Sequence, residues 1–288
     1  MTALSVVIPV HDNVGTLEQQ LLAVLAGTDV GDEVVVVDNR STDGSKAVAE
    51  QVGRLAAARG GGRVRVVEAH GRLGEGHARN VGVAAAANDL VAFCDGDDVV
   101  GEGWAGAMRD GLAKHRYVCG PVDVDRLNPP WLAGVRGRSI FQNRALLFGL
   151  VPFAHGCNLG VHRALAEQLG FDEDLEIGVD IDFAIRAWEL GVEMGWLPDA
   201  VVHYRHRTSM RALWRQGVGY GRTRPRLRRR LHGLVPRRTW WHNARNVVWL
   251  VRRVPRLGDR ATRARWVWVA AQLVGEGWGA ADRLRLRR

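Results

Sequence analysis

Short apolar runs of strand length alternate with helix-length segments through the first hundred residues. The apolar runs predict buried strands over Leu4–Pro9, Glu33–Val37, Val64–Val67 and Leu90–Cys94. The segments between them predict helices over Thr16–Ala26, Lys46–Arg59 and Gly76–Ala87. This β-α-β-α-β-α-β order indicates an α/β fold with a mostly parallel, Rossmann-like sheet flanked by helices, whose ligands bind beyond the carboxyl ends of the strands.

The pattern is less regular beyond residue 100. Val118–Val122 predicts one further strand, and Val179–Leu190 predicts an amphipathic helix. Residues 127–153 have a mixed pattern that predicts no defined element. Prolines at positions 225, 236 and 255 predict that the last part of the chain divides into short helices, because proline interrupts a helix.

Polar residues gather where two of the predicted strands end. The loop Asp38–Ser45 combines carboxylates, hydroxyls and a glycine before a helix, which suits polar ligand atoms, although a simply capped turn has the same composition. Asp95-Gly96-Asp97-Asp98 follows the fourth strand, and its carboxylates repel one another unless a cation neutralises them. Mg²⁺ or Mn²⁺ shared with substrate phosphates fits this loop, and a solvated turn is the alternative.

The glycine-rich segment Gly74–Gly82 does not fit a dinucleotide site. Arg79 stands where the third glycine of that fingerprint would be, and no acidic residue follows at the required distance. Arg79 instead lies at a loop-to-helix junction. There an arginine suits a phosphate or a base, or a structural ion pair.

Taken in order, these segments resemble the family-two glycosyltransferases of the GT-A fold. The resemblance rests on Ser5–Pro9, Asp38–Ser45, Ala78–Asn80, Asp95–Asp98, Gly156–Leu159, Phe171–Glu173 and Gly178–Phe183, and it covers residues 4–206. It implies the GT-A (nucleotide-diphospho-sugar transferase) fold. It also implies a metal-dependent, inverting transfer of a sugar from a nucleoside diphosphate donor to an acceptor hydroxyl, as in hexosyltransferases.

The resemblance also implies roles for particular residues. Asp180 matches the general base that deprotonates the acceptor hydroxyl. The nucleotide contacts are expected from Pro9, Val10, Asp12, Asp38, Ser41, Arg79 and Asp95. Asp97 and His203 are expected to hold Mn²⁺ or Mg²⁺, and Asn158 and Asp182 to contact the acceptor.

The chain departs from the family pattern at two places. Val179 stands where a glutamate usually precedes the catalytic aspartate, and Asn39-Arg40 replaces the commoner Asp-Gly. From the residues alone, Asp180 and Asp182 also fit a structural role as carboxylates at a helix N-terminus, where the helix dipole stabilises negative charge. His203 also fits a buried or surface histidine.

The composition excludes several classes of protein. With 47% hydrophobic and 25% charged residues in 288, the chain is typical of an ordered globular protein. Its apolar runs are too short for a bilayer span, and no secretory signal is visible at the N-terminus, so we expect a cytoplasmic protein. Three cysteines without a CxxC pair argue against a disulfide framework or structural zinc and predict small core residues.

Charge divides the chain in two. Residues 1–204 hold 17 basic and 28 acidic residues, whereas residues 205–288 hold 23 arginines and 3 acidic residues. We therefore predict a GT-A domain over 1–204, with a nucleotide-sugar half (1–100) and an acceptor half (101–204), followed by a helical tail over 205–288. The tail also carries seven of the eleven tryptophans.

Arginine and tryptophan among apolar stretches favour docking at the inner face of an anionic membrane, with a lipid-linked or cell-envelope acceptor. Packing on the catalytic domain or within a dimer is the second interpretation, and nucleic-acid binding the third.

Two other functions make distinct demands on the sequence. A sugar-nucleotide nucleotidyltransferase needs a glycine-rich loop after the first strand, and Val10-His11-Asp12-Asn13 is not one. A nucleic-acid-binding protein would use the basic tail, and its binding would survive loss of Asp97.

Overall fold

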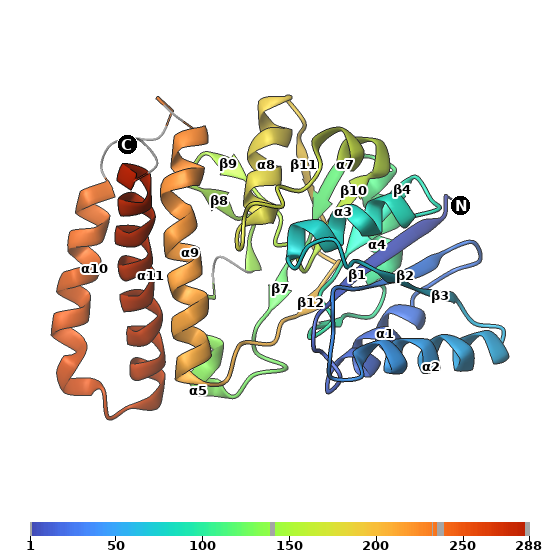
Figure 1. Cartoon of the computed structure of the whole chain (residues 1–288), viewed down its shortest axis with the longest axis horizontal. Helices are drawn as coiled ribbons and strands as arrows, with labels where there is room; N and C mark the ends of the chain where they lie inside the picture. The colour runs from blue at the N-terminus through green and yellow to red at the C-terminus, as the bar shows by residue number, and fades with distance from the viewer. Residues whose placement is uncertain (1, 139–141, 232, 235–238, 286–288) are drawn as a thin grey trace. The chain divides into compact units, whose positions relative to one another are not determined.

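The chain forms two compact units, seen in a computed structural model that describes residues 2–138, 142–231, 233–234 and 239–285 (Figure 1). The first unit comprises Met1–Arg126 and Ile140–Arg205. The second comprises Leu127–Ser139 and His206–Arg288. The basic C-terminal segment therefore folds together with a short stretch from the middle of the chain.

A seven-stranded sheet forms the centre of the first unit. Its order is β11-β6-β10-β4-β1-β2-β3. The strands are β1 (Leu4–Val10), β2 (Glu33–Asp38), β3 (Arg63–Glu68), β4 (Leu90–Phe93), β6 (Tyr117–Cys119), β10 (Leu159–His162) and β11 (Met194–Trp196). Neighbouring strands are parallel except that β10 runs antiparallel to β4 and β6. The predicted α/β fold with a mostly parallel sheet is confirmed.

Helices cover both faces of this sheet because the strands are apolar on both sides. In β1, Val7 faces one core while Val6 and Ile8 face the other, and all three are fully buried. The Val7 core contains α3 (Glu75–Ala85), α7 (Arg163–Leu169) and α8 (Val179–Glu189). The opposite core contains α1 (Leu17–Leu25), α2 (Ser45–Ala58) and α4 (Trp104–Leu112), and Figure 1 shows α1 and α2 side by side below the sheet.

Short strands complete the first unit. β5 (Val99–Val100), β12 (Val202–His203) and β7 (Val122–Asp123) form a three-stranded sheet, and β8 (Leu146–Leu147) pairs with β9 (Val151–Pro152). The prediction of one strand over Val118–Val122 is wrong, because β6 ends at Cys119 and β7 begins in another sheet. The break follows from close packing, since a Cβ at Gly120 would collide with the backbone oxygen of Ala200.

Two long helices that lie side by side in Figure 1, α9 (Met210–Arg230) and α11 (Arg260–Arg285), make up most of the second unit and run in the same direction. Glycines bring their backbones together: a Cβ at Gly275 would lie 2.9 Å from the amide nitrogen of Arg222, with the oxygen of Val218 closer still. Glu276 of α11 lies 3.2 Å from Arg228 of α9, an ion pair across the same contact. The other elements are α5 (Pro130–Ala133), α10 (Thr239–Arg253) and a 3₁₀ turn at Val254–Arg256.

The prolines divide this unit only in part. Pro255 lies in the 3₁₀ turn between α10 and α11, as predicted, and Pro236 lies outside the described residues. The prediction that Pro225 ends a helix is wrong, because α9 continues through it to Arg230. Proline leaves the carbonyl of Gly221 without its helical donor, and the tight packing of Gly221 and Pro225 against α11 supports the helix there. Within the described part of the chain, no helix has both the length and the apolar character to cross a membrane.

Candidate active site

The acidic loop after β4 is held in place from three sides. Gln20 of α1 donates to the carbonyl of Asp95 and accepts from the amide of Val100 on β5, at 2.9 Å in both cases. Thr16 donates to the carbonyl of Gly96. Arg205 donates its Nε to the carbonyl of Asp97 and its amide to Oδ1 of Asp98. These bonds fix the loop at the carboxyl end of β4, next to β1.

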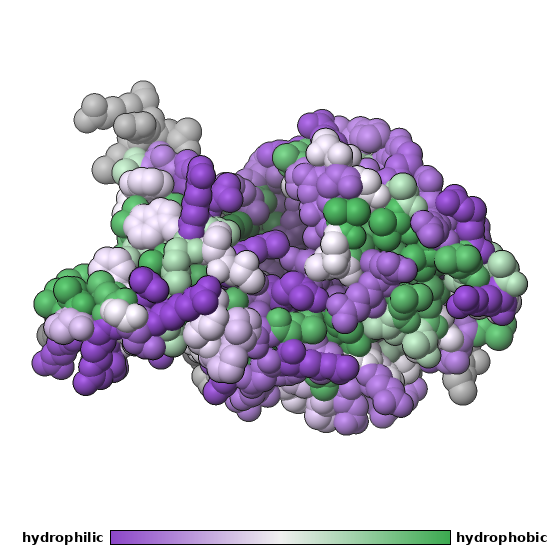
Figure 2. All heavy atoms as spheres, turned by 90° about the horizontal axis from the view of Figure 1, so that it is seen from below, coloured by the Kyte–Doolittle hydropathy of each residue, from purple (hydrophilic) through white to green (hydrophobic). Residues whose placement is uncertain are grey.

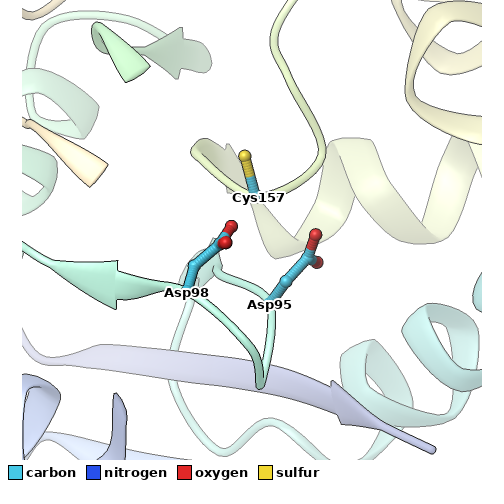
Figure 3. A group of neighbouring side chains, drawn as sticks. All are labelled: Asp95, Asp98 and Cys157. Carbon is cyan, nitrogen blue, oxygen red and sulfur yellow. The ribbon is translucent and has the colours of Figure 1, made fainter. Parts of the chain in front are cut away.

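Asp95, Asp98 and Cys157 bring their side-chain ligand atoms within 4.8 Å of one another (Figure 3). Asp98 is fully buried, and its Oδ2 has no hydrogen-bond partner. Burial raises the pKa of Asp98 well above its ordinary value, and the charges of Asp97 and Asp95 raise it further. An acceptor that lacks a donor among other carboxylates is a site that a cation would stabilise.

Burial also raises the pKa of Asp95, to about 7. Arg79 lowers it, whereas the negative charges of Glu75, Asp97 and Asp180 raise it. Burial among these acids likewise raises the pKa of the Cys157 thiol well above its ordinary value, so the thiol stays protonated. The donor set is thus two hard carboxylates beside a neutral sulfur, which suits Mg²⁺ or Mn²⁺ better than a metal that selects thiolate.

Arg79 is the buried positive charge of this site. It is fully inaccessible, its Nη1 lies 2.5 Å from Glu75, and its Nη2 lies 3.5 Å from Asp95. Its guanidinium packs against the rings of Phe93 and Phe171, at 5.9 and 5.6 Å. None of its N–H groups makes a hydrogen bond of good geometry, so these contacts are ion pairs and ring contacts that leave donor capacity for a ligand.

Asp180 lies close to this arginine, at the start of α8. Gly178 precedes the helix with φ of 85°, a left-handed conformation that glycine adopts without strain. The Asp180 carboxylate accepts from the amide of Gly156 through Oδ2 and from its neighbour Ile181 through Oδ1, both at 2.9 Å. Asp180 also raises the pKa of both Arg79 and Asp95, so the three side chains share one electrostatic environment.

A second polar group lies at the carboxyl ends of β1 and β2. Asp38 is buried, and its Oδ1 has no hydrogen-bond partner among the described residues. Asp12 accepts from the amide of Thr42 at 2.7 Å, and its own amide donates to Ser41, so the two loops are joined. Neighbouring strands β2, β1 and β4 therefore present Asp38, this joined loop and Asp95 along one edge of the sheet.

Sequence comparison identifies the family of this chain. The model of "Glycosyl transferase family 2" matches residues 5–170, and that of "Glycosyl transferase family group 2" matches residues 90–284. The chain belongs to glycosyl transferase family 2. The resemblance drawn from the ordered motifs is thereby confirmed.

Two curated relatives of this family-2 chain share under 30% sequence identity with it. It is 29% identical over 233 residues to the pre-mycofactocin glycosyltransferase of Mycobacterium tuberculosis, covering 75% of this chain and 46% of that protein. It is 28% identical over 227 residues to the succinoglycan biosynthesis protein ExoO of Rhizobium meliloti, covering 72% and 62%. The chain thus spans about half the length of the first relative.

Solved structures confirm the GT-A fold. The mannosyltransferase PcManGT from Pyrobaculum calidifontis, in complex with GDP-Man and Mn²⁺, matches with a TM-score of 0.60 and 19% identity, over 98% of this chain and 75% of that one. Glucosyl-3-phosphoglycerate synthase from Mycobacterium tuberculosis, in complex with Mn²⁺, UDP-Glc and phosphoglyceric acid, matches with a TM-score of 0.56 and 22% identity, over 80% and 79%.

Three predicted ligand residues of this family-2 chain bind other protein groups. Asn158 is fully buried and bonds Trp104, Pro121 and Ala200 with its oxygen and both amide hydrogens. Asp182 is buried and pairs with Arg186 at 2.8 Å. His203 bonds Asp123 through Nδ1 and Arg126 through Nε2. Contacts of these three residues with acceptor or metal stay predictions, and the bonds that the structure contains position the walls of the site.

The remaining predicted residues lie near the cluster. Asp97 belongs to the acidic loop and raises the pKa of its neighbours Asp95 and Asp98, although the group that could hold a cation contains those two. Val10 is buried at the end of β1, where it pairs with Asp38, and Pro9 is half-buried beside it. A metal contact of Asp97 and nucleotide contacts of Pro9 and Val10 also stay predictions.

Sequence reasoning missed four members of this site. The sequence shows Asp98 only as the third acid of the loop, and it predicts Cys157 as a small core residue. Glu75 carried one signal, its i,i+4 spacing to Arg79 on α3. Gly156 stands in the segment Gly156–Leu159 of the family resemblance, but nothing in the sequence marks its contact with Arg79: a Cβ there would lie 2.9 Å from Cζ of Arg79 and closer to Nη2, so glycine makes room for the guanidinium.

Proposed function

We propose that this chain transfers a sugar from a nucleoside diphosphate sugar to an acceptor hydroxyl, with inversion at the anomeric carbon. The observation that carries the proposal is the cluster in which a buried Arg79 lies among Asp95, Asp180 and Glu75. The guanidinium groups of Arg79 and Arg205 cannot balance these three acids together with Asp97 and Asp98 of the acidic loop. The excess negative charge would hold a divalent cation. Sugar transfer from a nucleoside diphosphate needs such a cation beside the leaving diphosphate.

The acidic loop fits Mn²⁺ or Mg²⁺. The carboxylates of Asp95 and Asp98 would hold the ion, with Asp97 adding negative charge, and the unpartnered Oδ2 of Asp98 supports this assignment. A bound ion would supply the positive charge that stabilises a departing diphosphate. The guanidinium of Arg79, held against Asp95, would donate to phosphate or ribose oxygens on the same side.

Asp180 is the proposed general base. The two amides that donate to its carboxylate fix its orientation. It would take the proton from the acceptor hydroxyl as that oxygen attacks the anomeric carbon. Attack from the face opposite the diphosphate inverts the configuration. Val179, where the family pattern has a glutamate, is fully buried in the core, so a single carboxylate serves this side.

Asp38 is proposed to bind the nucleobase. Its buried, unpartnered Oδ1 suits an N–H donor from the base edge. The structural neighbours carry GDP-Man and UDP-Glc, so we propose a UDP- or GDP-sugar as donor.

Calorimetric titration of UDP and GDP, each with and without Mn²⁺, tests the proposal. We expect metal-dependent binding of one nucleotide, lost in Asp95→Asn and retained in Asp180→Asn, while Asp180→Asn loses turnover of the sugar donor. Asp110→Asn, an exposed carboxylate on α4, is the matched control and should keep both properties. Binding of neither nucleotide, or equal binding by Asp95→Asn, would contradict the proposal.

We also propose that the basic C-terminal segment docks this enzyme on an anionic membrane and gives it a lipid-linked or cell-envelope acceptor. Val247, Val251 and Val254 recur at helical spacing along α10 and the turn after it, and each is at least half exposed. Figure 2 shows apolar surface beside strongly hydrophilic surface at the α10 side of the second unit. Exposed valines beside arginines suit the interface of an anionic bilayer, which accepts apolar side chains and attracts positive charge.

Cosedimentation with vesicles tests the docking. We expect binding to phosphatidylglycerol vesicles and little binding to phosphatidylcholine vesicles. The double change Val247→Ser with Val251→Ser should weaken it, whereas Val30→Ser, at a fully exposed valine of the first unit, should not. Equal failure with both vesicle types would remove this proposal, and salt-sensitive binding to RNA or DNA alone would favour the nucleic-acid interpretation.

A further inference from the structure

The second unit contains a cavity of about 260 Å³ that the proposed transfer reaction does not use. Its walls come from α5, α10 and the first turns of α11. Trp131 of α5 and Trp249 of α10 supply indole rings, Arg253 and Arg265 supply positive charge, and Thr262 supplies a hydroxyl. The volume is slightly below the range of about 300–1000 Å³ typical of ligand pockets, so the cavity suits a single small ring or headgroup.

The arginines of this cavity have no carboxylate partner among the described residues. The second unit has three acidic residues, and within the described ranges none of them forms an ion pair with Arg253 or Arg265. Glu276 pairs with Arg224 and Arg228, Asp282 pairs with Arg222, and Asp259 accepts from the amide of Thr262, a residue that lines the cavity. Two arginines therefore line the cavity without an ion-pair partner in the described chain, and one acid lies beside it.

Aromatic rings hold these guanidinium groups instead. Arg253 and Arg265 lie 5.8 and 5.4 Å from the ring of Trp249, and Arg260 lies 3.9 Å from the ring of Trp131. A cation–π contact uses the face of the guanidinium and leaves its N–H groups available as donors. Arg253 and Arg265 thus line one cavity, lie against one indole ring and keep N–H donors for an anion.

We propose that this cavity, the Trp249 pocket, binds a phosphate ester. The phosphate oxygens accept from Arg253 and Arg265, and the carbon ring or chain of the ester packs on Trp131 and Trp249. A phosphate monoester fits better than a carboxylate because it carries up to two negative charges and three acceptor oxygens. Its source is either a water-soluble phosphate ester or the headgroup of a phospholipid.

Direct binding measurements test the pocket without reference to sugar transfer. Calorimetry with glucose 6-phosphate and cosedimentation with phosphatidylcholine vesicles, with and without phosphatidic acid, represent the two sources. We expect the double variant Arg253→Gln with Arg265→Gln to bind about tenfold to a hundredfold more weakly, because hydrogen bonds to charged groups are strong.

The matched control is Arg252→Gln with Arg256→Gln, which removes the same charge from exposed positions outside the cavity. With glucose 6-phosphate it should bind as the unchanged protein does, and with phosphatidic acid vesicles it should lose less binding than the 253/265 variant. The double variant Arg253→Lys with Arg265→Lys keeps the charge without the planar guanidinium and should bind with intermediate affinity. Thermal melts of each variant show that the helices remain folded.

Each outcome decides the proposal. Loss restricted to the 253/265 variant with glucose 6-phosphate supports a soluble ester, and the same pattern with phosphatidic acid vesicles alone supports a lipid headgroup. Equal weakening by both double variants would show general charge attraction and overturn the pocket, as would failure to bind either probe. Because nucleotide binding by the first unit is measured separately, failure here leaves the proposed transfer untouched.

Discussion

Replacing Gly156 by alanine should disturb Arg79 and, through it, the whole acidic cluster. The new Cβ would lie 2.9 Å from Cζ and 3.0 Å from Nη1 of Arg79, with Nη2 nearer still. Carbon atoms pack at about 3.5–4.0 Å, so the guanidinium or the backbone at 156 must retreat by at least about 0.6 Å. Arg79 has little room to do so, because it is fully buried against two phenylalanine rings.

The expected loss is about 1–3 kcal/mol in the free energy of unfolding, the usual cost of overpacking a core. Nucleotide affinity should fall as well, since Arg79 would leave Asp95 and the amide of Gly156 would move relative to Asp180. Urea unfolding followed by circular dichroism measures the first effect, and calorimetric titration with UDP or GDP and Mn²⁺ measures the second.

Gly106→Ala is the matched control, because nothing lies within 4 Å of a Cβ at that helical position. It should raise stability by about 0.5–1 kcal/mol. Arg79→Met supplies a further test, since the Gly156→Ala change should cost less in that background. The reasoning is refuted if Gly156→Ala is as stable as the unchanged chain, or if the cost is the same with and without Arg79.

Three further predictions concern Asp95, Gly275 and Asn158. Burial raises the folded-state pKa of Asp95 from 3.8 to about 7, so the stability from its bound proton is complete below 3.8 and is lost as the pH rises through 7. Without metal, Asp95→Asn should therefore raise the urea midpoint more at pH 8 than at pH 5, and a pH-independent difference would contradict this. Gly275→Ala should cost about 1–3 kcal/mol by separating α9 from α11, whereas Gly277→Ala, with open space around it, should not lower the melting temperature. Asn158→Ala should lower the thermal midpoint sharply, because it leaves the indole N–H of Trp104 and the buried carbonyl of Ala200 unpaired at about 1–3 kcal/mol each; a shift of the size seen at surface sites would disprove that role.

The regular part of the sheet could be predicted because its signal is local. Strands β1, β2 and β4 contain continuous apolar runs, β3 has valines interrupted by arginine, and each strand is followed or preceded by a helix whose apolar residues recur on one face. The sheet edge that holds Asp38 and Asp95 followed from the same pattern, since parallel neighbours end on one side. The later strands β7 to β12 are two to four residues long, too short for any periodicity to mark them.

The composition of the site was only partly predictable for a different reason. Asp95, Arg79 and Asp180 stand in motifs that name their role, whereas Cys157 and Gly156 matter because the chain returns to the acidic loop after the 57 residues between Asp98 and Gly156. The Asn39-Arg40 pair is a second case that the sequence does not explain. Arg40 has a φ of 65°, a conformation that glycine adopts more easily, and its side chain donates to the carbonyl of His70. No pattern of sequence neighbours records such a bond.

The order of residues by itself determined the fold class, the family and the division of charge, because these depend on hydrophobic periodicity, on motif order and on composition. Only the tertiary structure decided which acids share a buried arginine, which asparagine bonds the walls of the site, and which arginines form no ion pair with a carboxylate. Those properties depend on burial and on distances between side chains that are remote in sequence, and they exist only once the chain is packed.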